Sequence, residues 1–201
     1  MADLLPAIEL VSASNPAASV IWLHGLGADG NDFVSIAEDL GLPPQLVLRF
    51  IFPHAPMQAV TLNSGMVMRA WYDISASDLS LREDEAGVRA SQREIEKLIA
   101  REKQRGIAAN KIVLAGFSQG GAIALQTGLR YPERLAGLVA LSGYLLLPDV
   151  LRAEATAANR SAPIFQAHGT HDPMVPCAMA RVGCEHLVAA GYAAEWHEYP
   201  M

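Results

Sequence analysis

The 201-residue sequence predicts an α/β fold in which a mostly parallel sheet carries helices on both faces. Short β-type runs alternate with longer segments of helical periodicity, as right-handed crossover connections require. Hydrophobic residues make up 51% of the chain and charged residues 18%, which is enough apolar material for a sizeable core. The length suits one domain spanning residues 1–201, without linker or internal repeat.

Six segments have the composition of buried strands. Each is a short apolar run bounded by glycine, proline or polar residues. In chain order they are Ser19–His24, Leu46–Pro53, Lys111–Ala115, Ala136–Ser142, Pro163–His168 and Ala193–Tyr199. The residues before Ser19 predict a further strand or a hairpin, with the Ser-Asn-Pro sequence at 14–16 as a turn.

Five segments between these strands predict helices. Ser80 and Glu83 have the spacing of a capping box, and the glycine or proline after several segments is a typical stop signal. The predicted helices are Gly30–Gly41, Ser80–Arg105, Gln119–Tyr131, Asp149–Ala158 and Met174–Ala190. Residues His54–Asp73 show no clear period and predict a loop.

Charge and apolar patterning exclude several classes of protein. The formal net charge is −6 and the basic residues are scattered, so neither nucleic acid nor an anionic membrane surface is an expected partner. Apolar runs are interrupted before 18 residues, which argues against a transmembrane helix. Asp3, Pro6 and Glu9 interrupt the apolar start, so we expect no secretory signal there.

The cysteines predict neither a disulfide nor a metal site. If Cys177 and Cys184 lie on one helix, about 10 Å of rise separates them. A disulfide needs Cα atoms within about 7 Å. No Cys/His cluster has metal-ligand spacing, so we expect two reduced, buried thiols in a cytoplasmic protein and no metal site.

A glycine-rich turn follows the strand Ser19–His24. Gly25, Gly27 and Gly30 have the G-x-G-x-x-G spacing of a dinucleotide-binding loop. That interpretation also needs an acidic residue about 20 positions on, and the next strand ends in Arg-Phe-Ile-Phe-Pro-His-Ala without one. The glycines therefore serve either a tight strand-to-helix turn or a different ligand.

The sequence Gly116-Phe117-Ser118-Gln119-Gly120 lies between an apolar strand and a helix. This G-x-S-x-G context is typical of the nucleophile elbow of α/β-hydrolases. The glycines remove side chains that would collide across the sharp turn, and the serine hydroxyl is then exposed at a helix N-terminus. We therefore predict that Ser118 is a nucleophile in acyl transfer; the alternative is an ordinary Gly-Ser loop.

The other parts of an acyl-transfer site have candidates. Backbone N–H groups near Leu26 can face the site because Gly25 and Gly27 permit close approach, so this turn is the predicted second half of an oxyanion hole. Asp172 follows a later strand, where the acid that orients a catalytic histidine is expected. Its alternative role is an N-cap of the helix from Met174. His168 and His171 are interpreted as packing and loop residues.

Five segments together resemble the carboxylesterase and acyl-protein thioesterase (phospholipase/carboxylesterase) family of small α/β-hydrolases. They read VIWLHGLGADG, WYD, GFSQGG, HGTHDPMVP and WHEYP. The resemblance covers nearly the whole chain. It implies a cofactor-free serine hydrolase of short- to medium-chain esters or thioesters, cytoplasmic and in some members dimeric. It also implies Ser118 as nucleophile, Asp172 as triad acid, and the backbone N–H groups of Leu26 and Gln119 as oxyanion donors.

The triad histidine departs from this pattern. In the family it follows the last strand in a Gly-His pair, just after a segment like the Glu-Tyr-Pro-Met at 198–201. We therefore expect it just beyond Met201, together with a final helix, and we expect the 201-residue form to be nearly inactive. His186 lies in mid-helix and His197 within the last strand, so neither is expected to replace it. The alternative is a non-catalytic binding protein that keeps the fold without the base.

The predicted acyl pocket is open and shallow, because the short segment between the strands ending at Ser142 and starting at Pro163 has no room for a large cap domain. The substrate is expected to be a small ester or acyl thioester. The predicted lining consists of Met57, Met66, Met68, Trp71, Leu145, Leu146 and Val175.

Overall fold

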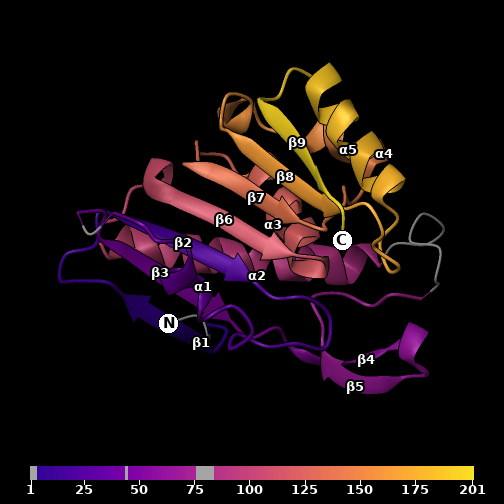
Figure 1. Cartoon of the computed structure of the whole chain (residues 1–201), viewed down its shortest axis with the longest axis horizontal. Coiled ribbons are helices and arrows are strands. Elements are labelled where there is room, and N and C mark those ends of the chain that lie inside the picture. The colour runs from indigo at the N-terminus through magenta and orange to yellow at the C-terminus, as the bar shows by residue number, and fades with distance from the viewer. Residues whose placement is uncertain (1–3, 44, 76–83) are drawn as a thin grey trace.

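The computed structural model describes residues 4–43, 45–75 and 84–201, and is built around one seven-stranded sheet (Figure 1). The strand order is β1-β3-β2-β6-β7-β8-β9. β1 pairs antiparallel with β3, and every other neighbouring pair is parallel. The strands are β1 (Ala7–Val11), β2 (Ala18–Leu23), β3 (Leu48–Pro53), β6 (Ile112–Phe117), β7 (Gly137–Leu141), β8 (Ile164–Gly169) and β9 (Ala194–Tyr199). The predicted mostly parallel sheet is confirmed.

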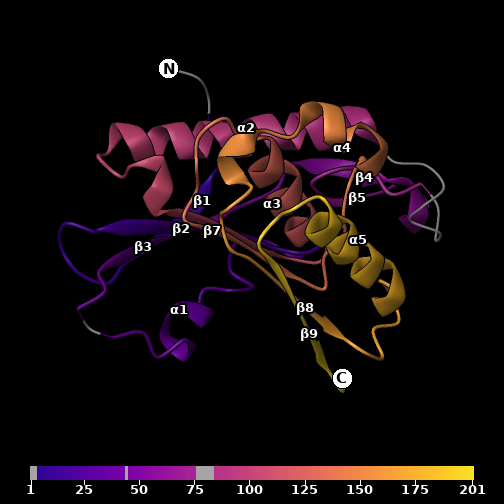
Figure 2. The same cartoon turned by 90° about the horizontal axis from the view of Figure 1, so that it is seen from above.

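Helices cover both faces of the sheet, but unequally. α2, α3, α4 and α5 lie on one face, and the short α1 lies on the other (Figure 2). The helices are α1 (Ile36–Asp39), α2 (Glu85–Gln104), α3 (Gln119–Arg130), α4 (Pro148–Glu154) and α5 (Cys177–Ala189), with 3₁₀ turns η1 (Thr61–Asn63), η2 (Ala109–Lys111) and η3 (Ala157–Asn159). The larger core lies under the four helices, and a smaller cluster around Trp22, Phe50 and Phe52 lies on the side of α1.

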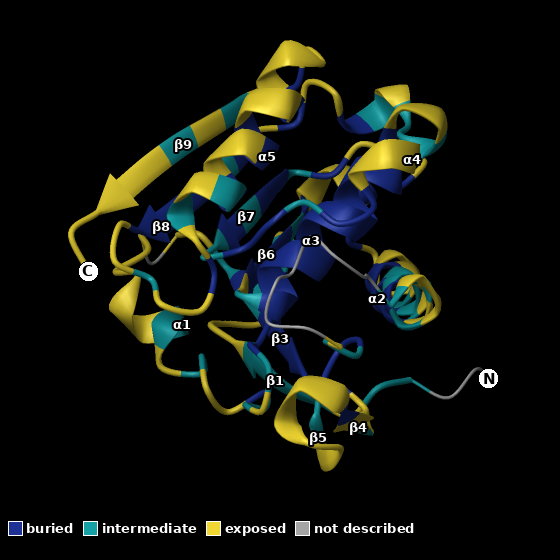
Figure 3. Ribbon diagram, turned by 90° about the vertical axis from the view of Figure 1, so that its right-hand side faces the viewer, coloured by how far each residue is buried: buried dark blue, intermediate teal, exposed yellow. Residues whose placement is uncertain are grey.

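α3 is the central helix of the fold. All of its residues are buried, which Figure 3 shows as a dark blue helix against the sheet. Small residues let it approach the strands closely: a Cβ on Gly128 would lie 2.2 Å from a methyl carbon of Leu138. This close packing holds the N-terminus of α3 at the carboxyl edge of the sheet, where ligands of such folds bind.

The predicted helix Gly30–Gly41 is largely wrong, because α1 contains only four residues. The Asp29 side chain accepts hydrogen bonds from the backbone and side-chain N–H groups of Asn31. Gly30 lies so close to β3 that a Cβ would be 2.4 Å from the carbonyl oxygen of Phe52. In the first half of this segment, the side-chain hydrogen bonds of Asp29 and the close packing of Gly30 therefore replace the backbone hydrogen bonds that a helix would form.

The predicted loop His54–Asp73 contains a β-hairpin, so that prediction is also wrong. β4 (Met57–Val60) pairs antiparallel with β5 (Met66–Arg69) in a separate two-stranded sheet. Ser64 and Gly65 both have positive φ, 57° and 77°, at the turn. The Asn-Ser-Gly sequence at 63–65 is the turn signal that could have identified this hairpin.

The remaining elements agree with the sequence to within a few residues. The capping box at Ser80 and Glu83 lies outside the described residues; α2 begins at Glu85, with the Asp84 side chain accepting from Gly87 N–H. Cys177 and Cys184 both lie on α5 and are free thiols, as predicted, but only Cys184 is buried and Cys177 is half-buried at the start of the helix. Among the described residues, none of the helices combines the length and the apolar character that crossing a membrane requires.

Candidate active site

Ser118 lies in a sharp turn between β6 and α3. Its backbone has φ 53° and ψ −121°, a conformation that non-glycine residues rarely adopt. A Cβ on Gly116 would lie 2.4 Å from the backbone of Gly120, and one on Gly120 would lie 2.4 Å from the carbonyl oxygen of Leu23. Only glycine fits at both positions. The Ser118 N–H donates to the Leu141 carbonyl at 2.8 Å, which ties the turn to β7.

The glycine-rich turn after β2 lies directly against this elbow. A Cβ on Gly25 would be 3.6 Å from the Cβ of Ser118. The Ala28 N–H donates to the Gly25 carbonyl at 3.3 Å, and Gly27 has φ 77° at the third position of that turn. Gly30 packs against β3, and its N–H donates to Nδ1 of His54 at 3.0 Å. Each of these glycines thus has a role in packing or turn geometry that requires no dinucleotide.

Among the backbone N–H groups of this region, those of Leu26 and Gln119 have no acceptor within the described part of the chain. Gln119 is the first residue of α3, so its N–H lies at the positive end of the helix dipole. The Gln119 side chain accepts from the Trp71 N–H at 2.8 Å and donates to the Tyr72 carbonyl at 2.7 Å. These bonds fix the start of α3 against the segment that follows the hairpin.

Asp172 follows β8 at the same edge of the sheet. Its Oδ1 accepts from the backbone N–H groups of Met174 and Val175, both at 2.9 Å. Because α5 begins only at Cys177, Asp172 caps the turn before the helix rather than the helix itself. Its Oδ2 lies 3.5 Å from Nε2 of buried His168. Because His168 Nε2 donates to the Val175 carbonyl at 2.9 Å, its contact with Oδ2 is secondary. Oδ1 thus orients the loop, and Oδ2 accepts no hydrogen bond among the described residues.

The two histidines that follow Asp172 in the sequence lie on other surfaces. His186 is exposed on α5. His197 stacks on Phe165 with ring centroids 4.7 Å apart, and its Nε2 is 3.5 Å from a carboxylate oxygen of Glu195. In contrast, Met201 lies beside the acid loop, where its carbonyl accepts from the His171 N–H at 2.9 Å.

The side chains predicted to line the acyl pocket do not lie in one place. Met57 and Met66 are exposed on the β4–β5 hairpin, whereas Met68 approaches the glycine-rich turn, its sulfur 3.7 Å from where a Cβ on Gly27 would be. Leu145 packs beside Gly183 of α5. The others are core residues: Trp71, Leu146 and Val175 are 1%, 1% and 4% exposed.

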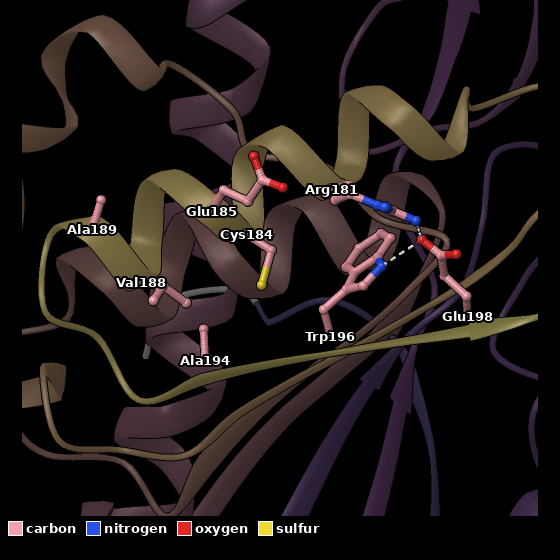
Figure 4. A pocket seen from close by; sticks show the side chains of 8 residues that line it. All are labelled: Arg181, Cys184, Glu185, Val188, Ala189, Ala194, Trp196 and Glu198. Atoms are coloured by element: carbon pink, nitrogen blue, oxygen red, sulfur yellow. Dashed lines mark hydrogen bonds and ion pairs between the residues drawn. The ribbon is translucent and has the colours of Figure 1, made fainter.

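A groove of about 670 Å³ lies elsewhere, between α5 and the edge strand β9 (Figure 4). Trp196 forms part of its lining, and the Trp196 Nε1 donates to Glu198, which also pairs with Arg181. None of the predicted site residues lines this groove. The Glu198 carboxylate and the Arg181 guanidinium are paired with each other, and none of the groups proposed for catalysis faces the groove, so we assign it no part in the chemistry of Ser118.

The sheet topology, the elbow at Ser118 and the acid after β8 define the class of this protein as an α/β-hydrolase. The chain belongs to the Phospholipase/Carboxylesterase family, whose sequence pattern matches residues 6–201. The predicted family and fold class are therefore confirmed.

Individual relatives agree with this assignment. Acyl-protein thioesterase 1 of Gibberella zeae is 38% identical over 197 residues, which cover 94% of this chain and 84% of the relative. Acyl-protein thioesterase 1 of Mycosarcoma maydis is 44% identical over 174 residues, 82% of this chain and 72% of the relative. The crystal structure of Arabidopsis thaliana SOBER1 superposes with a TM-score of 0.85 at 30% identity, covering 90% of this chain and 88% of that one.

These similarities confirm the predicted class of activity. The chain is a serine hydrolase of carboxylic esters or thioesters. The relatives give no support to the alternative of a non-catalytic binding protein.

Proposed function

We propose that Ser118 is the nucleophile of this hydrolase and that the Leu26 and Gln119 N–H groups form its oxyanion hole. The observation that carries the proposal is the juxtaposition at the elbow. A strained serine lies beside a glycine-rich turn, and the N–H groups of Leu26 and Gln119 have no acceptor among the described residues. The first N–H groups of a helix have no partner within it, and preorganised donors of this kind stabilise the tetrahedral intermediate of acyl transfer.

The reaction then proceeds through an acyl-enzyme. The Ser118 oxygen forms a bond to the acyl carbon, its proton passes to a histidine base, and the carbonyl oxygen becomes an oxyanion between the two N–H groups. The intermediate expels the thiol or alcohol, which takes the proton from the histidine. Water attacks the acyl-enzyme in the same way and releases the carboxylic acid. Asp172 holds and stabilises the imidazolium through its second carboxylate oxygen.

We place the base in a histidine that follows Met201, as the sequence leads us to expect. His186 and His197 lie on other surfaces, whereas the carboxyl end of β9 lies beside the Asp172 loop. A residue following Met201 would therefore enter the site at the edge where Asp172 lies.

The substrate that we favour is an acyl thioester carried by a protein, as the names of the thioesterase relatives suggest. Met68 beside the oxyanion turn is the proposed first contact of the acyl chain, with Met57 and Met66 of the hairpin further out. Leu145 is a proposed contact on the side of α5, and it packs against the core cluster that contains the buried Trp71, Leu146 and Val175.

The cellular setting belongs to the same proposal. We place the protein in the cytoplasm as a single domain that can form homodimers. We propose no nucleic-acid partner. The free thiols of Cys177 and Cys184 and the net charge of −6 support this setting.

Hydrolysis of a p-nitrophenyl ester by the natural-length protein, by the 201-residue chain and by a Ser118→Ala variant of each tests the proposed roles. We expect activity in the long wild type only, with the Ser118→Ala variant at least about 10³-fold slower. A fluorophosphonate probe should label Ser118 in the long form. Equal activity in both wild-type lengths would move the base to a histidine within residues 1–201, and unchanged activity of Ser118→Ala would reject the nucleophile.

A further inference from the structure

His24 is a buried histidine that the catalytic mechanism does not use. It follows β2 immediately before the glycine-rich turn and is 1% exposed. The indole Nε1 of Trp71 donates to its backbone carbonyl at 2.9 Å, and the two rings lie 5.3 Å apart. Neither the nucleophile nor the acid contacts it in the described interactions, so the burial and the hydrogen bonds of His24 need a separate explanation.

The hydrogen bonds of His24 determine its protonation state. The Ala55 N–H lies 3.0 Å from Nε2, and because a backbone N–H only donates, Nε2 must be the unprotonated acceptor. Nδ1 lies 2.7 Å from the carbonyl oxygen of Gly25, which only accepts, so Nδ1 must carry the proton. Only the neutral imidazole with its proton on Nδ1 satisfies both neighbours.

The bond to the Gly25 carbonyl also orients the next N–H group. A trans peptide is planar, so the carbonyl of Gly25 and the N–H of Leu26 point in opposite directions. With the carbonyl held toward His24, the Leu26 N–H points away from it. The same turn lies against the Ser118 elbow.

We infer that His24 is a positioning residue that holds the Gly25–Leu26 peptide so that the Leu26 N–H faces the oxyanion site. This inference rests on the proposed function of Leu26. His24 acts as a clamp with two ends: Ala55, just after β3, holds the imidazole, and the imidazole holds the oxyanion turn. Since the clamp uses backbone partners only, the neutral ring with this tautomer is the state that works.

The surroundings favour that state. Burial lowers the pKa of His24 below its usual 6.5, more than the other influences shift it. The charged or titratable groups near it are Asp29, which favours the charged form, and His54 and Arg69, which oppose it. If Nε2 were protonated, its N–H and the Ala55 N–H would face each other as two donors with no acceptor between them.

Two variants of the natural-length protein separate the ends of this clamp. The side-chain amide of His24→Asn lies near the Nδ1 position, so this variant keeps the donor to the Gly25 carbonyl and loses the acceptor for the Ala55 N–H. The amide of His24→Gln lies near the Nε2 position, so this variant keeps the acceptor for Ala55 and loses the donor to Gly25. We expect His24→Asn to stay within about 3-fold of the wild-type kcat. We expect His24→Gln to lose about 10- to 100-fold in kcat with little change in KM, somewhat less than the loss of a whole oxyanion donor.

Ser19→Ala is the matched control, because Ser19 lies at the other end of β2 and bonds only the distant Glu102 among the side chains described. It should lower the melting temperature without changing kcat.

Nitrogen-detected NMR of the His24 ring should show the proton on Nδ1. A proton on Nε2, or equal kcat losses in both His24 variants that follow their losses in melting temperature, would overturn the inference. Failure of the proposed function looks different: the wild type itself would neither hydrolyse the ester nor react with the fluorophosphonate at Ser118.

Discussion

At the scale of single residues, Ser118 adopts a backbone conformation that its own side chain disfavours. Its φ of 53° costs an L-residue about 1–2 kcal/mol, and this strain is held by the close packing of Gly116, Gly120 and Leu23. The strain exposes the hydroxyl at the end of α3. A position that is unfavourable for stability and useful for chemistry is expected to show a trade-off between the two.

Replacing Ser118 with glycine should therefore stabilise the fold while removing the nucleophile. Glycine relieves the strain of the positive φ but adds flexibility to the unfolded chain, so we expect a net gain of about 0.5–1 kcal/mol. Ser118→Ala keeps a Cβ and should show no such gain. Urea unfolding of the two variants and the wild type measures the difference. If Ser118→Gly is less stable than Ser118→Ala, the strain at this position is not significant.

At the scale of elements, α4 is joined to the neighbouring helices by one carboxylate. Glu154 near the end of α4 accepts from Arg89 of α2 at 2.6 Å and from Arg130 of α3 at 2.7 Å. The hydrogen bond from Arg89 has the largest effect on the pKa of Glu154, and together with the bond from Arg130 it lowers that pKa below 4.5. A carboxyl group whose pKa is lower in the folded state contributes stability above its unfolded pKa, and that contribution disappears as the pH falls through the folded value.

Glu154→Gln should thus reduce stability at neutral pH by about 1 kcal/mol, a modest value because the carboxylate is 30% exposed. The difference from wild type should shrink as the pH falls below 4.5 and vanish once Glu154 is protonated. Glu85→Gln removes a more exposed partner of Arg89 and is the control, with an effect near zero. Denaturant unfolding at several pH values measures both, and a pH-independent difference would contradict the assigned cause.

At the scale of the whole molecule, the candidate catalytic groups and a buried charge cluster lie at opposite ends of the sheet. The loops after β2, β6 and β8 gather the candidate catalytic groups at the carboxyl end. The opposite end holds a charge cluster around Glu102 of α2, whose side chain is fully buried. Glu102 accepts from Ser19 at 2.7 Å and from Arg49 at 2.6 Å, and also pairs with Arg105 at 3.2 Å. The cluster joins α2 to the strands far from the chemistry.

Glu102→Gln should destabilise the protein by about 3 kcal/mol, because it removes a buried carboxylate and leaves the largely buried Arg49 guanidinium without its charged partner. Since the cluster and the candidate site lie at opposite ends of the sheet, kcat per folded molecule should not change. Thermal unfolding together with active-site titration by a fluorophosphonate tests both halves of this expectation. A fall in kcat among correctly folded molecules would show coupling between the two ends.

The sequence by itself determined the fold class, most strand and helix positions and the place of the elbow. These follow from local information: apolar periodicity reports burial, and the glycines around Ser118 are the residues that such a turn tolerates. Two predictions were wrong. The predicted helix Gly30–Gly41 is mostly replaced by local hydrogen bonds such as that of Asn31 to Asp29, and the predicted loop His54–Asp73 contains a hairpin.

Only the tertiary structure decided which groups meet. The pairing of Gln119 with Trp71 and Tyr72, the clamp of His24 between Ala55 and Gly25, and the burial of Glu102 join residues distant in sequence. The structure also divided the predicted pocket residues between the exposed hairpin and the core. Such contacts depend on loop closure and on packing of the entire sheet, so no local pattern encodes them.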